Sequence, residues 1–306
     1  VTKVIHPKDP LARSREALAA VESEKDALIS DYAWDHNHPR PAADVKVEFP
    51  DADYATLFSI VGIKNAESND KSDWVWKGRI VLGGHDIRDK KGMHVVFDEL
   101  TSTPATMQAE RCLLAGHCAN PDEFDILQSD CLKAYIQSKI GGDRKTFVRL
   151  PKKWWPAHWH DIDDPVCELI LALYGHPRAG ECWYERISGV LFAHGFWCIP
   201  EWPCVFINNE DPKNIVVFIL YVDDLIMLGG KNMKAKEIKM DDPDKIKKYL
   251  GCHHEFFRDD VKQIAGYHMQ MSDFISSSCD VYTEKTGLTL KSAETPYAPE
   301  LPKDQT

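Results

Sequence analysis

The chain has 306 residues, of which 43% are hydrophobic and 28% charged, a composition typical of a folded protein with a sizeable core. No stretch approaches the roughly 18 to 20 consecutive apolar residues of a membrane-spanning helix, and the N-terminus lacks the apolar centre of a signal peptide. We therefore expect an intracellular protein with no membrane partner. The net charge of −11 argues against a protein that coats nucleic acid over its whole surface, because such binding depends on Lys and Arg.

The cysteines indicate neither a disulfide framework nor a zinc site. Nine of them lie between Cys112 and Cys279, and none forms a C-x-x-C pair. His117-Cys118 and Cys252-His253-His254 each lack a second pair of ligands at the spacing of a zinc finger. We expect reduced thiols.

The first third of the chain predicts an appendage followed by a hairpin and a helix. Residues 1–60 are acidic and interrupted by prolines, with one helix expected from Leu11 to Ser30. Residues 74–96 alternate as in two strands joined by a turn at 86–92, which places Lys77 and Arg79 on one face. A helix is expected from Thr103 to Cys118, with three side chains facing inward: Met107, Leu113 and Leu114.

The middle of the chain mixes strands and helices irregularly, which favours an α+β fold over a doubly wound parallel sheet. A strand from Phe124, a turn and a helix over 131–138 are expected, followed by a strand over 146–150. An amphipathic helix is expected from Cys182 to His194, with four side chains on its apolar face: Trp183, Ile187, Val190 and Leu191. Seven basic residues and one acidic residue lie between Lys133 and Lys153, which makes this segment a local basic patch.

Two adjacent carboxylates interrupt the most apolar segment of the chain. Residues 216–228 read VVFILYVDDLIML, which predicts a buried β-hairpin with Asp223 and Asp224 at its turn. Neighbouring carboxylates beside a buried sheet persist by facing water or by holding a divalent cation. Phosphoryl transfer with two Mg²⁺ ions requires a further carboxylate from a neighbouring strand. Asp130, where the strand from Phe124 ends, is the first candidate for it, and Asp125, inside that strand, is the competing one.

The segment Tyr221-Val222-Asp223-Asp224 resembles the catalytic hairpin of reverse transcriptases. Other segments resemble, in order and spacing, the reverse transcriptase of Copia-type LTR retrotransposons. They are the fingers motif over 77–84, the first catalytic strand over 128–136, the template-side segments at 173–175 and 183–184, and the primer-contacting segment at 249–252. The resemblance covers roughly Trp74 to Gly287 and implies a fragment of a Pol polyprotein.

The resemblance implies a right-hand polymerase fold with fingers, a palm with an antiparallel sheet, and the start of a thumb. The implied division is an acidic N-terminal appendage at 1–60, fingers and palm at 61–271, and thumb and linker at 272–306. Asp130, Asp223 and Asp224 would be the catalytic residues and would bind two Mg²⁺ ions, for which Mn²⁺ could substitute. Asp130 and Asp223 would be the main ligands, with Asp224 more structural.

The resemblance also assigns contacts to the substrates, which are dNTPs, an RNA template and a DNA primer. The residues implied to bind the nucleotide are Lys77, Arg79, Tyr135, Tyr174 and Gly175. Tyr135 would exclude a ribose 2′-hydroxyl, with core packing as its alternative role. The residues assigned to primer and template are Tyr221, Val222, Leu250, Gly251, Arg144 and Lys145. RNase H and integrase regions of the same polyprotein are implied partners, and the location is a cytoplasmic particle or the nucleus.

Two rival interpretations are also compatible with the sequence. One is an inactive, decayed or domesticated reverse-transcriptase fold that binds nucleic acid or protein. The other is an unrelated α+β enzyme that uses Asp223 and Asp224 to bind Mg²⁺ for a different phosphotransfer. Template-dependent primer extension distinguishes both from a reverse transcriptase.

Overall fold

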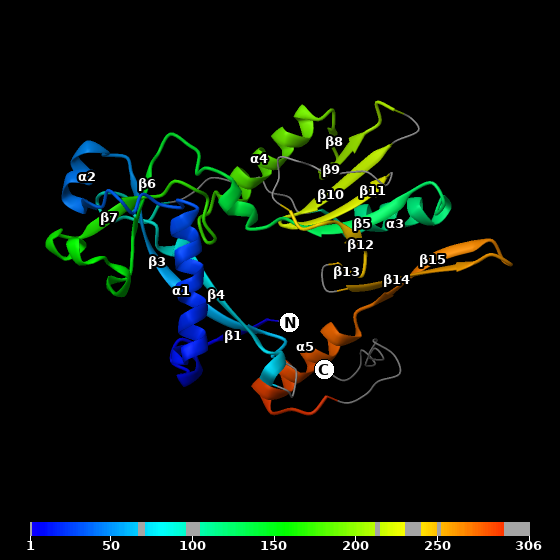
Figure 1. Ribbon diagram of the computed structural model, residues 1–306, viewed down its shortest axis with the longest axis horizontal. Helices are drawn as coiled ribbons and strands as arrows, with labels where there is room; N and C mark the ends of the chain where they lie inside the picture. Colours follow the sequence, from blue (N-terminus) through cyan, green and yellow to red (C-terminus); the bar gives the residue numbers. More distant parts are fainter. Residues whose placement is uncertain are drawn as a thin grey trace, which may run out of the picture.

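The computed structural model describes residues 2–66, 71–95, 105–211, 215–229, 240–249 and 252–290. Within these residues the chain forms three β-sheets and five α-helices, and most strand pairs are antiparallel (Figure 1). The expected mixture of helices with antiparallel sheets is confirmed. No helix in this part of the chain is long and apolar enough to cross a membrane.

The first sheet has six strands and is built around one long strand, β3 (Asp53–Lys64). β3 pairs antiparallel with β1 (Thr2–Ile5) and β4 (Val75–Leu82) and parallel with β6 (Thr146–Arg149). β6 continues the sheet to β7 (Pro165–Glu168) and β2 (Arg40–Pro41). The helix α1 (Arg15–Ser30) crosses β3 and β4 (Figure 1).

Residues 2–60 contribute strands and helices to this sheet, whereas the sequence led us to expect residues 1–60 as a separate appendage. They supply β1, α1, β2, α2 (Ala42–Glu48) and most of β3, and the expected boundary after residue 60 falls within β3. The expected helix from Leu11 is also shorter. The backbone of Ser14 is extended, and its side chain accepts a hydrogen bond from the Ala17 N–H. α1 therefore begins at Arg15, after a separate 3₁₀ turn over Pro10–Arg13.

The partner of β4 is β3, and not the segment after residue 86 as expected from the sequence. Eight residue pairs connect the two strands, from Leu57 opposite Leu82 to Lys64 opposite Val75. Residues 86–95 form isolated bridges, from Arg88 to His94 and from Arg88 to Tyr54, but no named strand that pairs with β4. The hairpin prediction fails because alternation shows which face of a strand is buried but not which strand lies beside it.

The second sheet is antiparallel and has the strand order β12-β5-β11-β10-β9-β8. Its strands are β12 (Asp244–Lys245), β5 (Asp125–Asp130), β11 (Asp224–Gly229), β10 (Val216–Tyr221), β9 (Trp202–Asn208) and β8 (Trp197–Ile199). Phe218 and Leu220 pack in one cluster with α4 (Ala179–Ala193), whereas Ile219 packs with α3 (Met107–Ala119). Helices therefore cover both faces, which explains why the hairpin is continuously apolar.

The expected helices flanking this sheet are present with two differences. α4 buries the four predicted side chains, Trp183, Ile187, Val190 and Leu191. α3 buries Leu113 and Leu114, but Met107 at its first turn is exposed. The helix expected over 131–138 is only a 3₁₀ turn, η4 (Ala134–Gln137), because Lys133 adopts a left-handed backbone with φ 51°.

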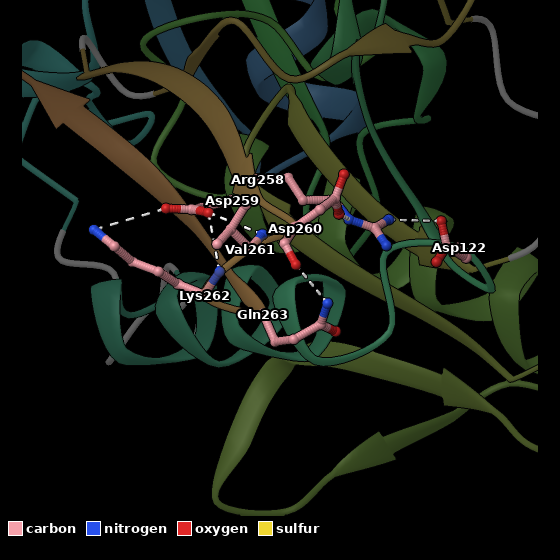
Figure 2. A network of polar contacts seen from close by, with 7 residues as sticks. All are labelled: Asp122, Arg258, Asp259, Asp260, Val261, Lys262 and Gln263. Atoms are coloured by element: carbon pink, nitrogen blue, oxygen red, sulfur yellow. Dashed lines mark hydrogen bonds and ion pairs between the residues drawn. The ribbon is translucent and has the colours of Figure 1, made fainter.

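A third sheet, formed by β13 (Lys248–Tyr249), β14 (Cys252–Asp259) and β15 (Ile264–Gln270), is attached to α3 and precedes α5 (Ser272–Thr286). A buried polar pair connects β14 with α3, with His254 Nε2 lying 2.8 Å from Glu110 Oε1. At the β14–β15 turn, Arg258 bridges Asp122 and Asp260 (Figure 2). Exposed ion pairs of this kind stabilise little, whereas removing either partner of the buried pair would leave the other buried without its partner.

Candidate active site

The three candidate carboxylates lie together at one end of the second sheet. Asp130 ends β5 and is the direct cross-strand partner of Asp224, the first residue of β11. Asp223 lies in the turn between β10 and β11. Asp125 is paired with Gly229 at the opposite end of the same ladder. The geometry therefore groups Asp130, and not Asp125, with Asp223 and Asp224.

The β10–β11 turn contains two residues, Val222 and Asp223, since Tyr221 already pairs with Asp224. Val222 has φ 58°, a left-handed conformation that is unusual for a β-branched residue. Glycine normally occupies the first position of such a turn. The Val222 side chain is exposed and that of Tyr221 is half-buried. The tight turn that places the carboxylates at this end of the sheet therefore contains a strained residue.

The cluster of carboxylates disfavours its own ionisation. Burial, followed by the charges of Asp223 and Asp130 and a hydrogen bond with Asp130, raises the pKa of Asp224 to about 7. Like charges directly opposite each other on neighbouring strands repel. A nearby cation would relieve this repulsion.

The chemistry of these side chains fits magnesium. Mg²⁺ prefers carboxylate oxygens, phosphate oxygens and water, and it rarely uses a cage made only of protein ligands. Among the residues that the structure describes, no three acidic, histidine or cysteine side chains already converge to hold a metal. The protein therefore offers a partial set of oxygen ligands, which a substrate phosphate and water would complete.

Two tyrosine rings lie beside the carboxylates. The ring centroids of Tyr135 and Tyr174 are 4.7 Å apart. Burial and the charge of Asp223 raise the pKa of both hydroxyl groups, that of Tyr174 to about 12. Arg79 has the opposite effect on the Tyr174 pKa, so these two side chains are also near one another. Tyr135 and Tyr174 thus form a half-buried aromatic wall next to Asp223.

Gly175 permits a close crossing of two backbone segments. It has φ 90°, and a Cβ at this position would lie 2.1 Å from the Leu82 carbonyl oxygen. The Leu82 N–H donates to the Tyr174 carbonyl at 2.8 Å. The resemblance implies that Gly175 binds the nucleotide, and the close approach that the structure describes is to the end of β4.

Lys77 and Arg79 occupy the same exposed face of β4, as predicted from the alternation. α1 packs on the other face, where a Cβ on Gly78 would lie 2.4 Å from the Ala20 carbonyl oxygen. The charges of Lys133, Arg79 and Lys77 all lower the pKa of Glu24 on α1, although burial raises it overall. These three cations therefore gather near α1, and Lys133 also pairs with Asp31.

Two other residues assigned to primer and template, Arg144 and Lys145, form ion pairs in the first sheet. Arg144 pairs with Asp53 and Lys145 with Glu168, both in the first sheet. Arg149 of the basic patch likewise pairs with Asp164. Acidic partners therefore neutralise much of the patch, which the count along the sequence could not reveal. Leu250 and Gly251 lie outside the described residues.

Trp183 contacts the site, although the sequence assigned it no individual role there and gave it only a place on the apolar face of its helix and in a template-side segment. The Trp183 indole N–H donates to the Val222 carbonyl at 2.6 Å, so α4 contacts the turn that carries Asp223. A buried indole usually requires a hydrogen-bond acceptor, and this requirement was the available signal. The acceptor itself could not be identified from the sequence.

Comparisons with known proteins agree with the motifs. Residues 59–299 match the family model described as reverse transcriptase (RNA-dependent DNA polymerase). The chain is also 26% identical, over 162 residues, to the retrovirus-related Pol polyprotein from transposon TNT 1-94 of Nicotiana tabacum. That match covers 53% of this chain and 11% of the polyprotein. The resemblance inferred from the motifs is confirmed, and the chain belongs to the reverse transcriptase family.

Proposed function

We propose that this chain is an RNA-directed DNA polymerase of an LTR retrotransposon, which extends a DNA primer on an RNA template. The observation that carries the proposal is the pairing of Asp130 with Asp224 beside Asp223, in a chain of the reverse transcriptase family. In the reaction, the primer 3′-oxygen bonds to the α-phosphorus of a dNTP. The bond from that phosphorus to the bridging oxygen breaks, pyrophosphate leaves, and the hydroxyl proton passes to water.

The carboxylates would hold the reacting groups through Mg²⁺. Asp130, Asp223 and Asp224 would bind two ions, which when bound activate the attacking oxygen and neutralise the leaving pyrophosphate. The strained turn supports this role, since such strain commonly occurs at functional sites. Mn²⁺, which accepts the same oxygen ligands, would substitute for Mg²⁺.

The nucleotide would lie between β4 and the carboxylates. Lys77 and Arg79 would bind the triphosphate, whose charge requires cations irrespective of the base. Tyr135 would lie under the sugar and exclude a 2′-hydroxyl, and Tyr174 with Gly175 would border the base. The ring contact between Tyr135 and Tyr174 near Asp223 supports this placement.

The domains and partners follow from the same proposal. The first sheet with α1 would correspond to fingers, the second sheet with α3 and α4 to the palm, and residues 272–306 to the start of a thumb. β13 and β14 would approach the primer. RNase H and integrase regions of a polyprotein would act with this chain.

Primer extension on poly-rA/oligo-dT with dTTP and Mg²⁺ tests the proposal. We expect template-dependent extension by the wild-type chain and its loss in Asp223→Asn. A folded wild-type chain that extends nothing, where a reverse transcriptase control succeeds, would favour a fold that only binds nucleic acid or protein. Extension that persists in Asp223→Asn would place the metal site elsewhere.

A further inference from the structure

The turn that carries Asp223 is held by hydrogen bonds from two other parts of the chain. The Val222 carbonyl accepts the Trp183 indole N–H at 2.6 Å. The Asp223 carbonyl accepts the Cys131 backbone N–H at 2.7 Å. α4 and the residue after β5 therefore both hold this two-residue turn.

These two hydrogen bonds fix the peptide planes on both sides of the Asp223 Cα. The Val222 carbonyl belongs to the plane before it, and the Asp223 carbonyl to the plane after it. Once both planes are fixed, the φ and ψ of Asp223 are fixed, and so is the direction of its Cα–Cβ bond. The direction in which the carboxylate leaves the backbone thus depends on the Trp183 N–H.

The strain at Val222 makes such a restraint necessary. A valine with φ 58° is held against its own preference, so a turn without external hydrogen bonds would relax to other conformations. Trp183 can act as a fixed donor because it is only 2% exposed and packs with Leu220 and Leu225 of the hairpin. Its ring cannot move without disturbing this cluster.

We infer that Trp183 is a positioning residue, whose indole N–H orients Asp223 for binding a divalent cation. The inference rests on the proposed function for the metal-binding role of Asp223. The competing role for Trp183 is core packing alone. Packing depends on the ring and positioning depends on the N–H, so the two roles can be separated.

The experiment compares Trp183→Phe with Trp155→Phe. Trp155 is a matched control, because its indole N–H also donates to a backbone carbonyl, that of Leu150 at 2.9 Å, but in the first sheet's cluster. Mn²⁺ binding would be measured by electron paramagnetic resonance for both variants, the wild-type chain and Asp223→Asn. Melting temperatures would show that each variant is folded.

We expect Trp183→Phe to weaken Mn²⁺ binding by about tenfold or more, the range typical for loss of a group that orients a metal ligand. Trp155→Phe should bind as the wild type does, and Asp223→Asn should lose the site. Wild-type affinity in folded Trp183→Phe would overturn the inference, and so would the absence of Asp223-dependent binding in the wild type. If Trp183→Phe does not fold, β-(3-benzothienyl)alanine at position 183 keeps the ring shape without the N–H, and the same criteria apply.

Primer extension supplies a second readout. The Mg²⁺ concentration at half-maximal extension should rise in Trp183→Phe, whereas the KM for dTTP at saturating Mg²⁺ should stay near that of the wild type. A packing role would lower only the active fraction and leave the Mg²⁺ midpoint unchanged, which would contradict positioning. If no variant extends primers but the Mn²⁺ pattern holds, the proposed function is wrong and the role of Trp183 stands.

Discussion

Asp130 and Asp224 are direct cross-strand partners at the end of β5 and β11, so two carboxylates face each other where the ladder meets the turn. Like charges in this position oppose folding unless a proton or a cation separates them. Stability and metal binding are therefore coupled at this pair.

Asp224→Asn should stabilise the metal-free protein at pH 8. The pKa of Asp224 is raised from 3.8 to about 7, so its contribution to stability is fully present below pH about 4 and is lost as the pH rises through 7. The variant has no carboxyl group at position 224 to ionise, so it does not lose this stability. Its melting temperature should exceed that of the wild type at pH 8 and match it near pH 4. Adding Mg²⁺ should narrow the difference at pH 8 by stabilising the wild type more. Equal melting temperatures at pH 8 without metal would contradict the prediction.

The two aspartates of β5 should behave differently in primer extension. Asp130→Asn should reduce the rate by about a hundredfold or more, because loss of a ligand exceeds the 10–100-fold typical for loss of a group behind it. Asp125→Asn should stay within about twofold of the wild type, since Asp125 pairs with Gly229 at the other end of the ladder. The reverse order would make Asp125 the ligand.

Gly175→Ala should destabilise the fold in urea unfolding. The added Cβ would overlap the Leu82 carbonyl oxygen, and φ 90° adds about 1–3 kcal/mol of backbone strain. Gly189→Ala is the control, because Gly189 lies in α4 with open space around its Cβ position. There alanine should stabilise the helix by about 0.5–1 kcal/mol. If the unfolding free energy changed in the same direction in both variants, the close crossing at Gly175 would be contradicted.

Tyr135→Val should admit ribonucleotides. Removing the ring beside Tyr174 opens space for a 2′-hydroxyl, and the ratio of dTTP to UTP incorporation should fall by about tenfold, or about 1.4 kcal/mol. Tyr135→Phe keeps the ring and should keep the ratio. An unchanged ratio in folded Tyr135→Val would assign Tyr135 to core packing alone.

His176 should make the protein less stable in mild acid. Burial, assisted by Arg178, lowers the pKa of His176 from 6.5 to about 4. Its contribution to stability is present above pH 6.5 and is lost as the pH falls towards 4, because the unfolded chain binds the proton first. The unfolding free energy should decrease in this window by at most about 1.4 kcal/mol per pH unit for one proton. His176→Asn should flatten the decrease, and exposed His158→Asn should not; equal profiles in the wild type and His176→Asn would exclude His176 as the cause.

Local patterns predicted those features that depend on neighbours in the chain. The β10–β11 hairpin, the strand β6 and the four buried side chains of α4 follow from apolar periodicity. Two features of the fold could not be read from the sequence, for the same physical reason. The sequence could not show that β4 pairs with β3, nor that strands within residues 2–60 belong to the first sheet, because strand pairing depends on contacts between distant segments.

The sequence by itself determined the family and the apolar hairpin that carries two adjacent carboxylates, because both depend on residue order. Only the tertiary structure decided that Asp130 faces Asp224, that acidic partners neutralise Arg144 and Lys145, and that Trp183 holds the Val222 carbonyl. Cross-strand register, ion pairing and a buried indole's acceptor all join residues far apart in the chain. The fold brings these residues together, and their spacing in the sequence does not indicate which of them become partners.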